Sequence, residues 1–368
     1  MKKFLLFACA LIFAFSANSQ TLMIGGEEVA SGTYGPGGLS CLKSGNVRWY
    51  KSIKTLTLIN AVIEYDGSVD FEGESGEGMP GILLISSDEQ ITVELAGENK
   101  ITDTGSDAKK RSNGCMMSTK GFKFVHVENY EKASLEATAP IGIIASNDAV
   151  LSFDNVDVTI NATKHTGFHS GVIANTGHKI EVLNGSRLVV RTGYEKVAIP
   201  VNFGLTLGSD VTLKAPAYAS IGTYNSHSNI LLNEESQLVK GLVVIGPKCS
   251  GMGYYVYFKD WDGIVLSQQG VCHGDDAVAP ADPVRTGFTF MGWDKEFSNV
   301  TKALTINAVY DEGSALNEVS LSEERLLENP AVRVFNVLGA DVTAHKDNLP
   351  QGAYILRVGN KVQKISIK

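Results

Sequence analysis

The chain has 368 residues, of which 43% are hydrophobic and 20% are charged, and its formal net charge is −8. This balance argues against a disordered chain, and an acidic surface without a basic stripe excludes nucleic acid as an expected partner. The length predicts two or three domains, and 38 glycines are typical of a turn-rich, all-β protein.

Residues 1–19 have the pattern of a secretory signal peptide. Lys2 and Lys3 form a positive end, an apolar stretch follows over residues 4–15, and the small residues at 17–19 provide a cleavage site. The apolar stretch is short for a membrane span, and no other stretch approaches that length. We therefore expect a protein that is secreted or attached to the outer membrane or cell surface, with no transmembrane segment.

One pattern recurs about seven times between Leu56 and Leu238. A short run of alternating apolar residues is followed by a turn with Asn or Gly, a second run, and a Gly-Ile-like step. The apolar positions aligned in this way lie 31, 28, 30, 25 and 25 residues apart, and they are Ile91, Phe122, Val150, Ile180, Leu205 and Ile230. A period of about 20 to 50 residues indicates a solenoid, in which each unit buries its apolar face by stacking on its neighbours.

The local pattern within each unit predicts strands joined by tight corners. Apolar residues alternate with a period of two, as in LTL at 56–58 and ITV at 91–93. Asn tolerates left-handed backbone angles, so we expect corners at Asn60, Asn129, Asn155, Asn184 and Asn233. Glycine precedes the next strand of the coil at Gly81, Gly114, Gly142 and Gly171. We expect an all-β chain in which residues 20–248 form a right-handed parallel β-helix.

The opening of this region carries more specific features. IGGEEVASG begins at Ile24, and a first coil with LTLINAVIE begins at Leu56. Residues 21–245 thereby resemble surface proteins of Bacteroidota and Firmicutes, some of which are grouped as carbohydrate-binding β-helix domains. The resemblance implies non-catalytic recognition of an extracellular glycan.

Aromatic side chains near the ends of the coils are the candidates for stacking on sugar rings. They are Trp49, Tyr50, Tyr194, Tyr218 and Tyr224. The alternative is that these side chains close the ends of the solenoid or fill its corners. A second functional hypothesis is a protein-contact adhesin, whose partner would be a surface protein.

Residues 254–311 form a separate pattern. We expect a hairpin closed at Asp262 and Gly263, a proline-rich crossing, a strand over GFTFMGW at 287–293 and a last strand over LTINAVY at 304–310.

This module, with boundaries at 249–312, resembles the Listeria–Bacteroides repeat, the B repeat of internalin-type surface proteins. The matching residues are Phe258, Trp261, Gly263, Pro280, Pro283, Gly287, Phe288, Phe290, Gly292, Trp293, Asp294, Val300, Leu304 and Tyr310. The resemblance implies a small β-grasp-like domain that serves as a spacer or contact module. Because small domains need large aromatic residues inside, we expect Trp261 and Trp293 in its core.

Four cysteines remain after removal of the leader, and in an exported chain they allow three disulfide connectivities. The hairpin expected near Asp262 brings residues near 250 opposite residues near 272. We therefore favour a Cys249–Cys272 disulfide, which leaves Cys41–Cys115 as the second. The alternative is four free thiols. The cysteine and histidine spacing does not favour a zinc site.

The chain after a linker at 313–330 ends in a small β domain. Residues 331–368 contain three strand patterns, at 332–337, 353–358 and 362–367. Together with LPQGAYILRV from Leu349 and the final KISIK, they resemble the type A C-terminal sorting domain of the type IX secretion system of Bacteroidota, which has a β-sandwich-like fold. The signature residues are Val334, Gly339, Leu349, Gly352 and Tyr354. The resemblance implies that the type IX machinery is a partner.

An enzyme is the remaining alternative, since β-helices can be polysaccharide lyases or hydrolases. Such sites need paired carboxylates or an acidic Ca²⁺ cluster beside a basic residue. Asp154 and Asp157 lie three apart, so a strand would direct them to opposite faces. His165 and His169 flank Gly167, which favours a loop over a metal-binding helix. We expect no catalytic residues, no metal and no cofactor.

Overall fold

The computed structural model describes residues 20–66, 81–105, 114–145, 148–170, 177–311, 332–337, 339–358 and 361–367. The expected leader, the linker at 313–330 and the step at Gly171 lie outside these ranges. Within them the chain is all-β, and its helical segments are the short 3₁₀ helices η1 (Lys51–Ile53) and η2 (Thr343–Asn348). No helix in these ranges is long and apolar enough to cross a membrane.

Packing divides the chain into two compact units. One unit extends to Ala281 and includes Lys295–Asn307, and the other consists of Asp282–Asp294 with Ala308–Lys368. The first unit holds the repeated sequence pattern and most of the core.

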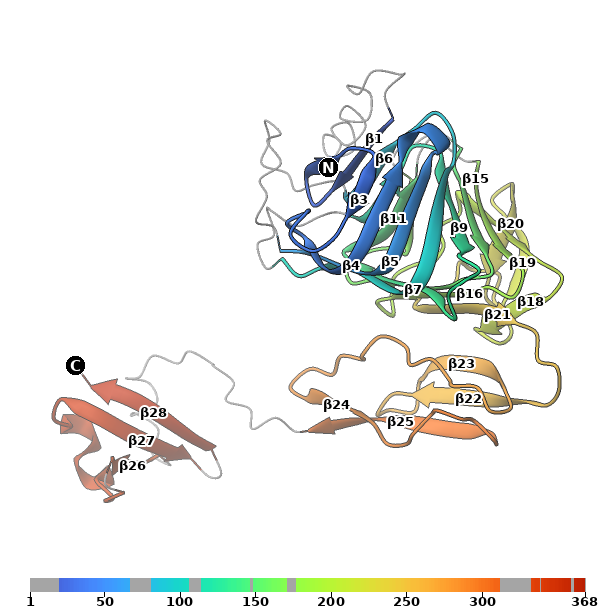
Figure 1. The fold of residues 1–368 in the computed structure, drawn as a ribbon. Coiled ribbons are helices and arrows are strands. Elements are labelled where there is room, and N and C mark those ends of the chain that lie inside the picture. Colours follow the sequence, from blue (N-terminus) through green and yellow to red (C-terminus); the bar gives the residue numbers. More distant parts are fainter. Residues whose placement is uncertain are drawn as a thin grey trace. The chain divides into compact units, whose positions relative to one another are not determined.

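The repeated strands of the first unit belong to a sheet of thirteen strands and a sheet of six (Figure 1). We divide their parallel pairing into three ladders, two in the larger sheet and one in the smaller. The first ladder contains the first halves of β5 (Thr55–Tyr65) and β7 (Ile91–Asp103), then β9 (Gly121–His126), β12 (Val150–Asp154), β15 (His178–Leu183) and β17 (Phe203–Leu207). Inward-facing side chains stack along the ladder, and the rings of Phe124 and Phe153 lie parallel with centroids 5.0 Å apart. Each such fully buried side chain stabilises the fold by about 1.5–3 kcal/mol.

The strand register corrects two positions of the expected period. Ile91, Phe122, Leu151, Ile180 and Leu205 stand in register along the first ladder. Leu151 therefore takes the place that we assigned to Val150, whose half-buried side chain lies one position away. The last position, Ile230, is also wrong, because it belongs to β20 (His227–Leu232), which pairs antiparallel with β19 (Ser220–Tyr224).

The second ladder continues from the same long strands. It contains the second halves of β5 and β7, then β10 (Ala133–Ala139), β13 (Asp157–Ala162) and β16 (Arg187–Thr192), and it ends with the antiparallel strands β21 (Leu242–Pro247) and β18 (Val211–Ala215). The direction of pairing thus changes at β21, where the parallel repeat ends.

The third ladder contains β6 (Gly81–Ser86), β8 (Gly114–Ser118), β11 (Ile141–Ala145) and β14 (Phe168–Ser170). At its start, β1 (Thr21–Ile24) pairs antiparallel with β6 and with β2 (Glu27–Val29). Gly81 and Gly114 begin their strands as expected, whereas Gly142 lies inside β11. A Cβ atom at Gly142 would lie 2.1 Å from the carbonyl oxygen of Gly167, so close packing of neighbouring strands requires glycine there.

Asparagine forms corners between the ladders, as the sequence predicts. Asn60, Asn155 and Asn184 have φ values of 47°, 56° and 48°, in the left-handed region that asparagine tolerates. The side-chain amide of Asn184 donates a 2.6 Å hydrogen bond to Asp154, which ends the neighbouring strand β12. Asn129 and Asn233 do not have positive φ, so the backbone signature of the corner is limited to three of the five positions.

Antiparallel strands cover the edge of β5. β3 (Gly32–Tyr34) pairs with β4 (Leu42–Tyr50), and β4 pairs with β5. Apolar side chains of β4, of β1 and of all three ladders join one continuous core. The repeated strands therefore bury their apolar faces in one shared core. Antiparallel strands flank them, β4 at the start of the repeat and β21 at its end.

The module after residue 249 forms a four-strand sheet with the order β23-β22-β25-β24. Its strands are β22 (Gly253–Lys259), β23 (Val265–Cys272), β24 (Thr289–Trp293) and β25 (Leu304–Asp311). β22 and β23 form the expected hairpin, with Gly263 at φ 85° in its turn, and β22 runs parallel to β25. Val256 and Phe258 are buried, whereas Trp261 is exposed. The expectation that Trp261 lies in the core is wrong, because this residue belongs to the hairpin turn.

The tail contains three antiparallel strands, β26 (Arg333–Asn336), β27 (Gly352–Val358) and β28 (Lys361–Ile367). The strand patterns expected in the tail are thus confirmed. Val334 and Tyr354 belong to its small core, and Leu349 packs against it. The Tyr354 hydroxyl donates a 2.8 Å hydrogen bond to the carbonyl oxygen of Pro350, and Gly339 occupies a turn at φ 81°.

Candidate functional site

Trp49 does not belong to a sugar-stacking surface. Its side chain is 1% exposed and forms part of the main core. β4 pairs antiparallel with β5, with Trp49 opposite Leu56, so strand alternation directs Trp49 inward and the neighbouring Tyr50 outward. The sugar-stacking role of Trp49 is therefore corrected, and its burial fits the alternative, a side chain that closes one end of the repeat.

The other four candidates lie in three places. Tyr50, 42% exposed, ends β4, and Tyr224 is half-buried in the β19–β20 hairpin. Tyr194 and Tyr218 are exposed and follow β16 and β18, at the end of the second ladder. Tyr50 lies elsewhere, opposite Thr55 in the half of β5 that starts the first ladder. The structure thus brings only Tyr194 and Tyr218 to one region among the described candidates.

An apolar patch on the outer face of the second ladder positions this region. Val189, Ala215, Leu242 and Val244 are buried on that face, and Val278, from the chain segment after β23, packs against them. Burying outward-facing apolar residues in this way removes them from water and fixes the covering segment in place.

Polar contacts hold the covering segment in register. The buried side chain of Gln269 bonds the backbone of Val278 on both sides, accepting from its N–H at 2.9 Å and donating to its carbonyl oxygen. Arg191 on β16 donates a 3.0 Å hydrogen bond to the carbonyl oxygen of Ala279. The backbone N–H of Ala217 donates to the carbonyl oxygen of Gln268 at 3.0 Å. These contacts attach β23 and the segment after it to the second ladder.

A pair of exposed tyrosines lies at the junction where β22, β23 and the segment after them attach to the second ladder. The ring centroids of Tyr218, after β18, and Tyr255, on β22, are 5.8 Å apart with an interplanar angle of 33°. The two side chains are 49% and 46% exposed. Tyr218 raises the pKa of Tyr255 above its usual value, first because two phenolates would repel and second through a hydrogen bond between the side chains. Both exposed rings therefore present a flat apolar face and a polar tip to solvent.

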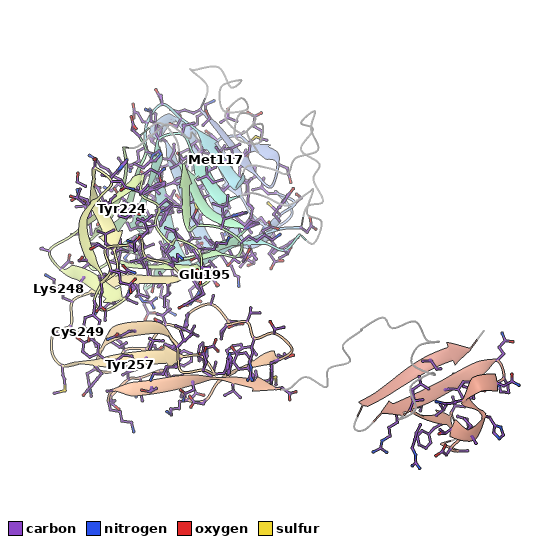
Figure 2. All side chains as sticks on the ribbon, turned by 180° about the vertical axis from the view of Figure 1, so that it is seen from behind. Met117, Glu195, Tyr224, Lys248, Cys249 and Tyr257 are labelled. Atoms are coloured by element: carbon purple, nitrogen blue, oxygen red, sulfur yellow. A yellow bond between two sulfur atoms is a disulfide. The ribbon has the colours of Figure 1, made fainter. Side chains whose placement is uncertain are left out.

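Each tyrosine of the pair lines a different hollow. We name the first the acidic hollow; it has a volume of about 280 Å³, and its lining includes Tyr218, Asn233, Glu234, Glu235, Lys240 and Gln268. The second, the lysine hollow, has a volume of about 360 Å³, and its lining includes Lys214, Lys248, Cys249, Tyr254 and Tyr255. Ala217 lines both. Figure 2 shows Lys248 and Cys249 where the chain passes from β21 to β22.

The two hollows differ in charge. Lys240 in the acidic hollow forms a 3.0 Å ion pair with Glu195, the neighbour of Tyr194. In the lysine hollow, burial lowers the pKa of Lys214 while Asp275 opposes that change. The Nζ atom of Lys214 lies 2.8 Å from Cys272 Sγ and 3.2 Å from Cys249 Sγ. The junction therefore combines apolar ring faces with hydrogen-bonding groups of both charges.

Such an arrangement suits a ligand with apolar and hydroxyl-rich faces. Tyrosine offers a flat apolar face and a polar tip, and small binding sites combine such surfaces with a few convergent polar groups. Tyr255 is a site residue that we did not predict. The alternation of the buried Val256 and Phe258 along β22 contains the signal, because it directs the side chain of Tyr255 to the other face.

One expected disulfide is present and the other is not. Cys249 and Cys272 are bonded, whereas Cys41 and Cys115 are both free and buried. The Cys41 thiol packs beside Gly25, and Cys115 faces the carbonyl oxygen of Ile101. Both thiols belong to the main core but are not bonded to each other, which corrects the Cys41–Cys115 pairing. It was inferred only by elimination.

The acidic residues considered for catalysis have local partners. Asp154 pairs with Lys123 at 3.8 Å, and Asp157 pairs with Arg187 at 3.3 Å on the adjacent strand. Within the ranges that the structure describes, no group of three or more His, Cys, Asp or Glu side chains could hold a metal ion.

Comparison with family models, curated proteins and solved structures gave no match to this chain.

Proposed function

We propose that this chain is a secreted or surface-attached, non-catalytic recognition protein that binds an extracellular glycan. The observation that carries the proposal is the exposed Tyr218–Tyr255 pair, in which each tyrosine lines one of two polar hollows. A pyranose ring laid on the pair would place its hydroxyl groups near the carboxylates of the acidic hollow, while its apolar face covers the tyrosine rings.

The three parts of the chain support the proposal, because each resembles a part of bacterial surface proteins. We infer that the three ladders are the faces of a right-handed parallel β-helix, since β5, β7, β9 and β12 each begin a turn of the chain that visits the ladders in order, and β15 and β16 continue the first two. The strand order of the module, with parallel central strands, supports a β-grasp-like fold. The three-strand tail supports the β-sandwich-like sorting domain, and with it export by the type IX machinery.

The glycan proposal is tested with the mature chain, residues 20–368, on an array of neutral and acidic oligosaccharides, followed by titration calorimetry with each glycan that binds. Tyr218→Ala and Tyr255→Ala should each weaken binding about tenfold or more, since aromatic anchors contribute more than about 1.4 kcal/mol at binding sites. Tyr50→Ala is the matched control, because it removes a tyrosine of similar exposure that ends β4, beside the first ladder. A wild-type chain that binds no glycan, or variants that bind as well as wild type, would contradict the proposal.

A protein-contact adhesin is the second candidate, and one observation favours it. Trp261, Ile264 and Val265 are exposed together at the tip of the β22–β23 hairpin. Exposed aromatic and aliphatic residues of this kind are common at protein interfaces. Retention of a surface protein by the wild-type chain, lost in Trp261→Ser and kept in Tyr218→Ala, would favour the adhesin over the glycan-binding protein.

A further inference from the structure

We propose that the Cys249–Cys272 disulfide is a thiol-exchange site, at which a low-molecular-weight thiol entering the lysine hollow attacks Cys249 and displaces Cys272 as a thiolate beside Lys214. This inference is independent of glycan binding, because it depends on the sulfur chemistry of the hollow and not on the tyrosine pair.

The position of the Lys214 ammonium group carries the inference. Its Nζ atom lies 2.8 Å from Cys272 Sγ and 3.2 Å from Cys249 Sγ, and the ion pairs among the described residues do not include Lys214. In the intact disulfide both sulfur atoms are neutral and are weak hydrogen-bond acceptors. The Lys214 ammonium group therefore has a charged partner at the disulfide only when one sulfur becomes a thiolate.

A thiolate beside a cation is a better leaving group in thiol–disulfide exchange. An opposite charge within about 4–6 Å lowers the pKa of an acid, and a leaving thiol of lower pKa departs faster. Lys214 is closer to Cys272 than to Cys249. The Asp275 carboxylate also favours the charged form of Lys214, although burial opposes it. The contact therefore directs bond cleavage so that Cys272 becomes the thiolate.

The two sulfur atoms also differ in access. Both cysteines are half-buried. Cys249 lines the lysine hollow of about 360 Å³, whereas Cys272 lines a separate hollow of only about 50 Å³ beside Arg187 and Asp275. The larger volume falls within the range of small-molecule sites, so an entering thiol meets Cys249.

The reaction is balanced by two equivalents of the external thiol. The first thiolate forms a bond with Cys249 Sγ, the Cys249–Cys272 bond breaks, and its electron pair stays on Cys272 Sγ beside Lys214. A second thiolate then attacks the sulfur of the bound small thiol and releases Cys249 as a thiolate. The products are one oxidised small disulfide and two cysteine thiols, each protonated from solvent.

The remaining cysteines have no part in this chemistry. Burial raises the pKa of Cys41 to about 11, with Glu27 adding to the effect, and burial raises the pKa of Cys115 further. Thiolates, not thiols, are the nucleophiles in exchange. Cys41 and Cys115 therefore serve as internal controls that stay unmodified in the folded chain.

The experiment exposes the mature chain to reduced glutathione at pH 7, stops the reaction by alkylation at timed intervals, and locates each modification by peptide mass spectrometry. The wild type should carry glutathione on Cys249 and the alkyl group on Cys272. Lys214→Met should slow the opening of the disulfide about tenfold, whereas Lys214→Arg retains the charge and should stay within about threefold of wild type. Lys248→Met is the matched control, since this exposed lysine lines the same hollow without contacting the sulfurs, and it should react like wild type.

Three results would overturn the inference: equal rates in wild type and Lys214→Met, an adduct mainly on Cys272, or a disulfide that glutathione opens only after the chain is unfolded. The position of the adduct is measured on the wild type alone, so it decides the matter even where Lys214→Met does not fold. Circular dichroism of each variant identifies that case.

Discussion

Replacing Trp49 with alanine separates a structural role from a binding role at the residue that the sequence places among the glycan candidates. The side chain is 1% exposed and packs in the main core behind β4, opposite Leu56 on β5. Truncating a buried tryptophan to alanine removes its transfer free energy and leaves a cavity, which together destabilise a protein by about 3–5 kcal/mol. For a folding unit of this size the midpoint of thermal unfolding should fall by roughly 6–20 °C.

The matched control is the next residue along the same strand. Tyr50 is 42% exposed, so Tyr50→Ala should change the free energy of unfolding by no more than about 0.5 kcal/mol. Urea unfolding followed by far-ultraviolet circular dichroism measures both variants without relying on tryptophan fluorescence. Trp49→Ala should keep the glycan affinity of the fraction that remains folded. A Trp49→Ala variant of nearly wild-type stability that has lost glycan binding would refute the inward placement of this side chain.

Further predictions concern a tight strand contact, a buried histidine and the tail. Gly121→Ala should destabilise the chain by more than about 2 kcal/mol in the same urea-unfolding assay, because φ is +92° and a Cβ would lie 2.0 Å from the carbonyl oxygen of Val150. Gly185→Ala is the control and should destabilise it by about 1 kcal/mol, because φ is +71° but no atom lies closer than 4.0 Å. Burial lowers the pKa of His178 below its usual 6.5. As the pH falls below about 6.5, the unfolded chain therefore binds a proton at His178 before the folded chain does, and stability should be lost. His178→Gln should reduce this fall in the urea midpoint. Removal of residues 332–368 should abolish display at the cell surface in fractionated cells, and unchanged display would contradict the role of the tail as a sorting signal.

Local patterns in the sequence were sufficient to predict the strands and several corners. The left-handed angles at Asn60, Asn155 and Asn184 follow from a residue type that tolerates them. The β22–β23 hairpin and its disulfide follow from one turn, because antiparallel pairing sets which residues come opposite each other. Such features depend on neighbours that are close along the chain.

Features that depend on distant neighbours could not be predicted in this way. Val189 occupies an outward position on β16, and its burial depends on Val278, which comes much later in the chain. The pairing of Cys41 with Cys115 rests on elimination alone, and only the fold shows that each is a buried free thiol. Trp49 was assigned to the surface because β4 was not assigned to the edge of β5, although its alternation with Tyr50 contains the correct answer.

The candidate site is built from two separate regions of the sequence. Tyr218 comes from the segment after β18, and Tyr255 comes from β22 in the following module. The site thus needs the packing of Val278 against the second ladder, which attaches the two sequence regions. Val278→Asp would place a charge against a buried apolar patch, an unfavourable change of several kcal/mol that opposes this packing. Its glycan affinity should fall as far as that of Tyr218→Ala, although Val278 contacts no ligand. If Val278→Asp binds as wild type while Tyr218→Ala does not, the segment after β18 alone holds the site, and the tyrosine pair has no joint role.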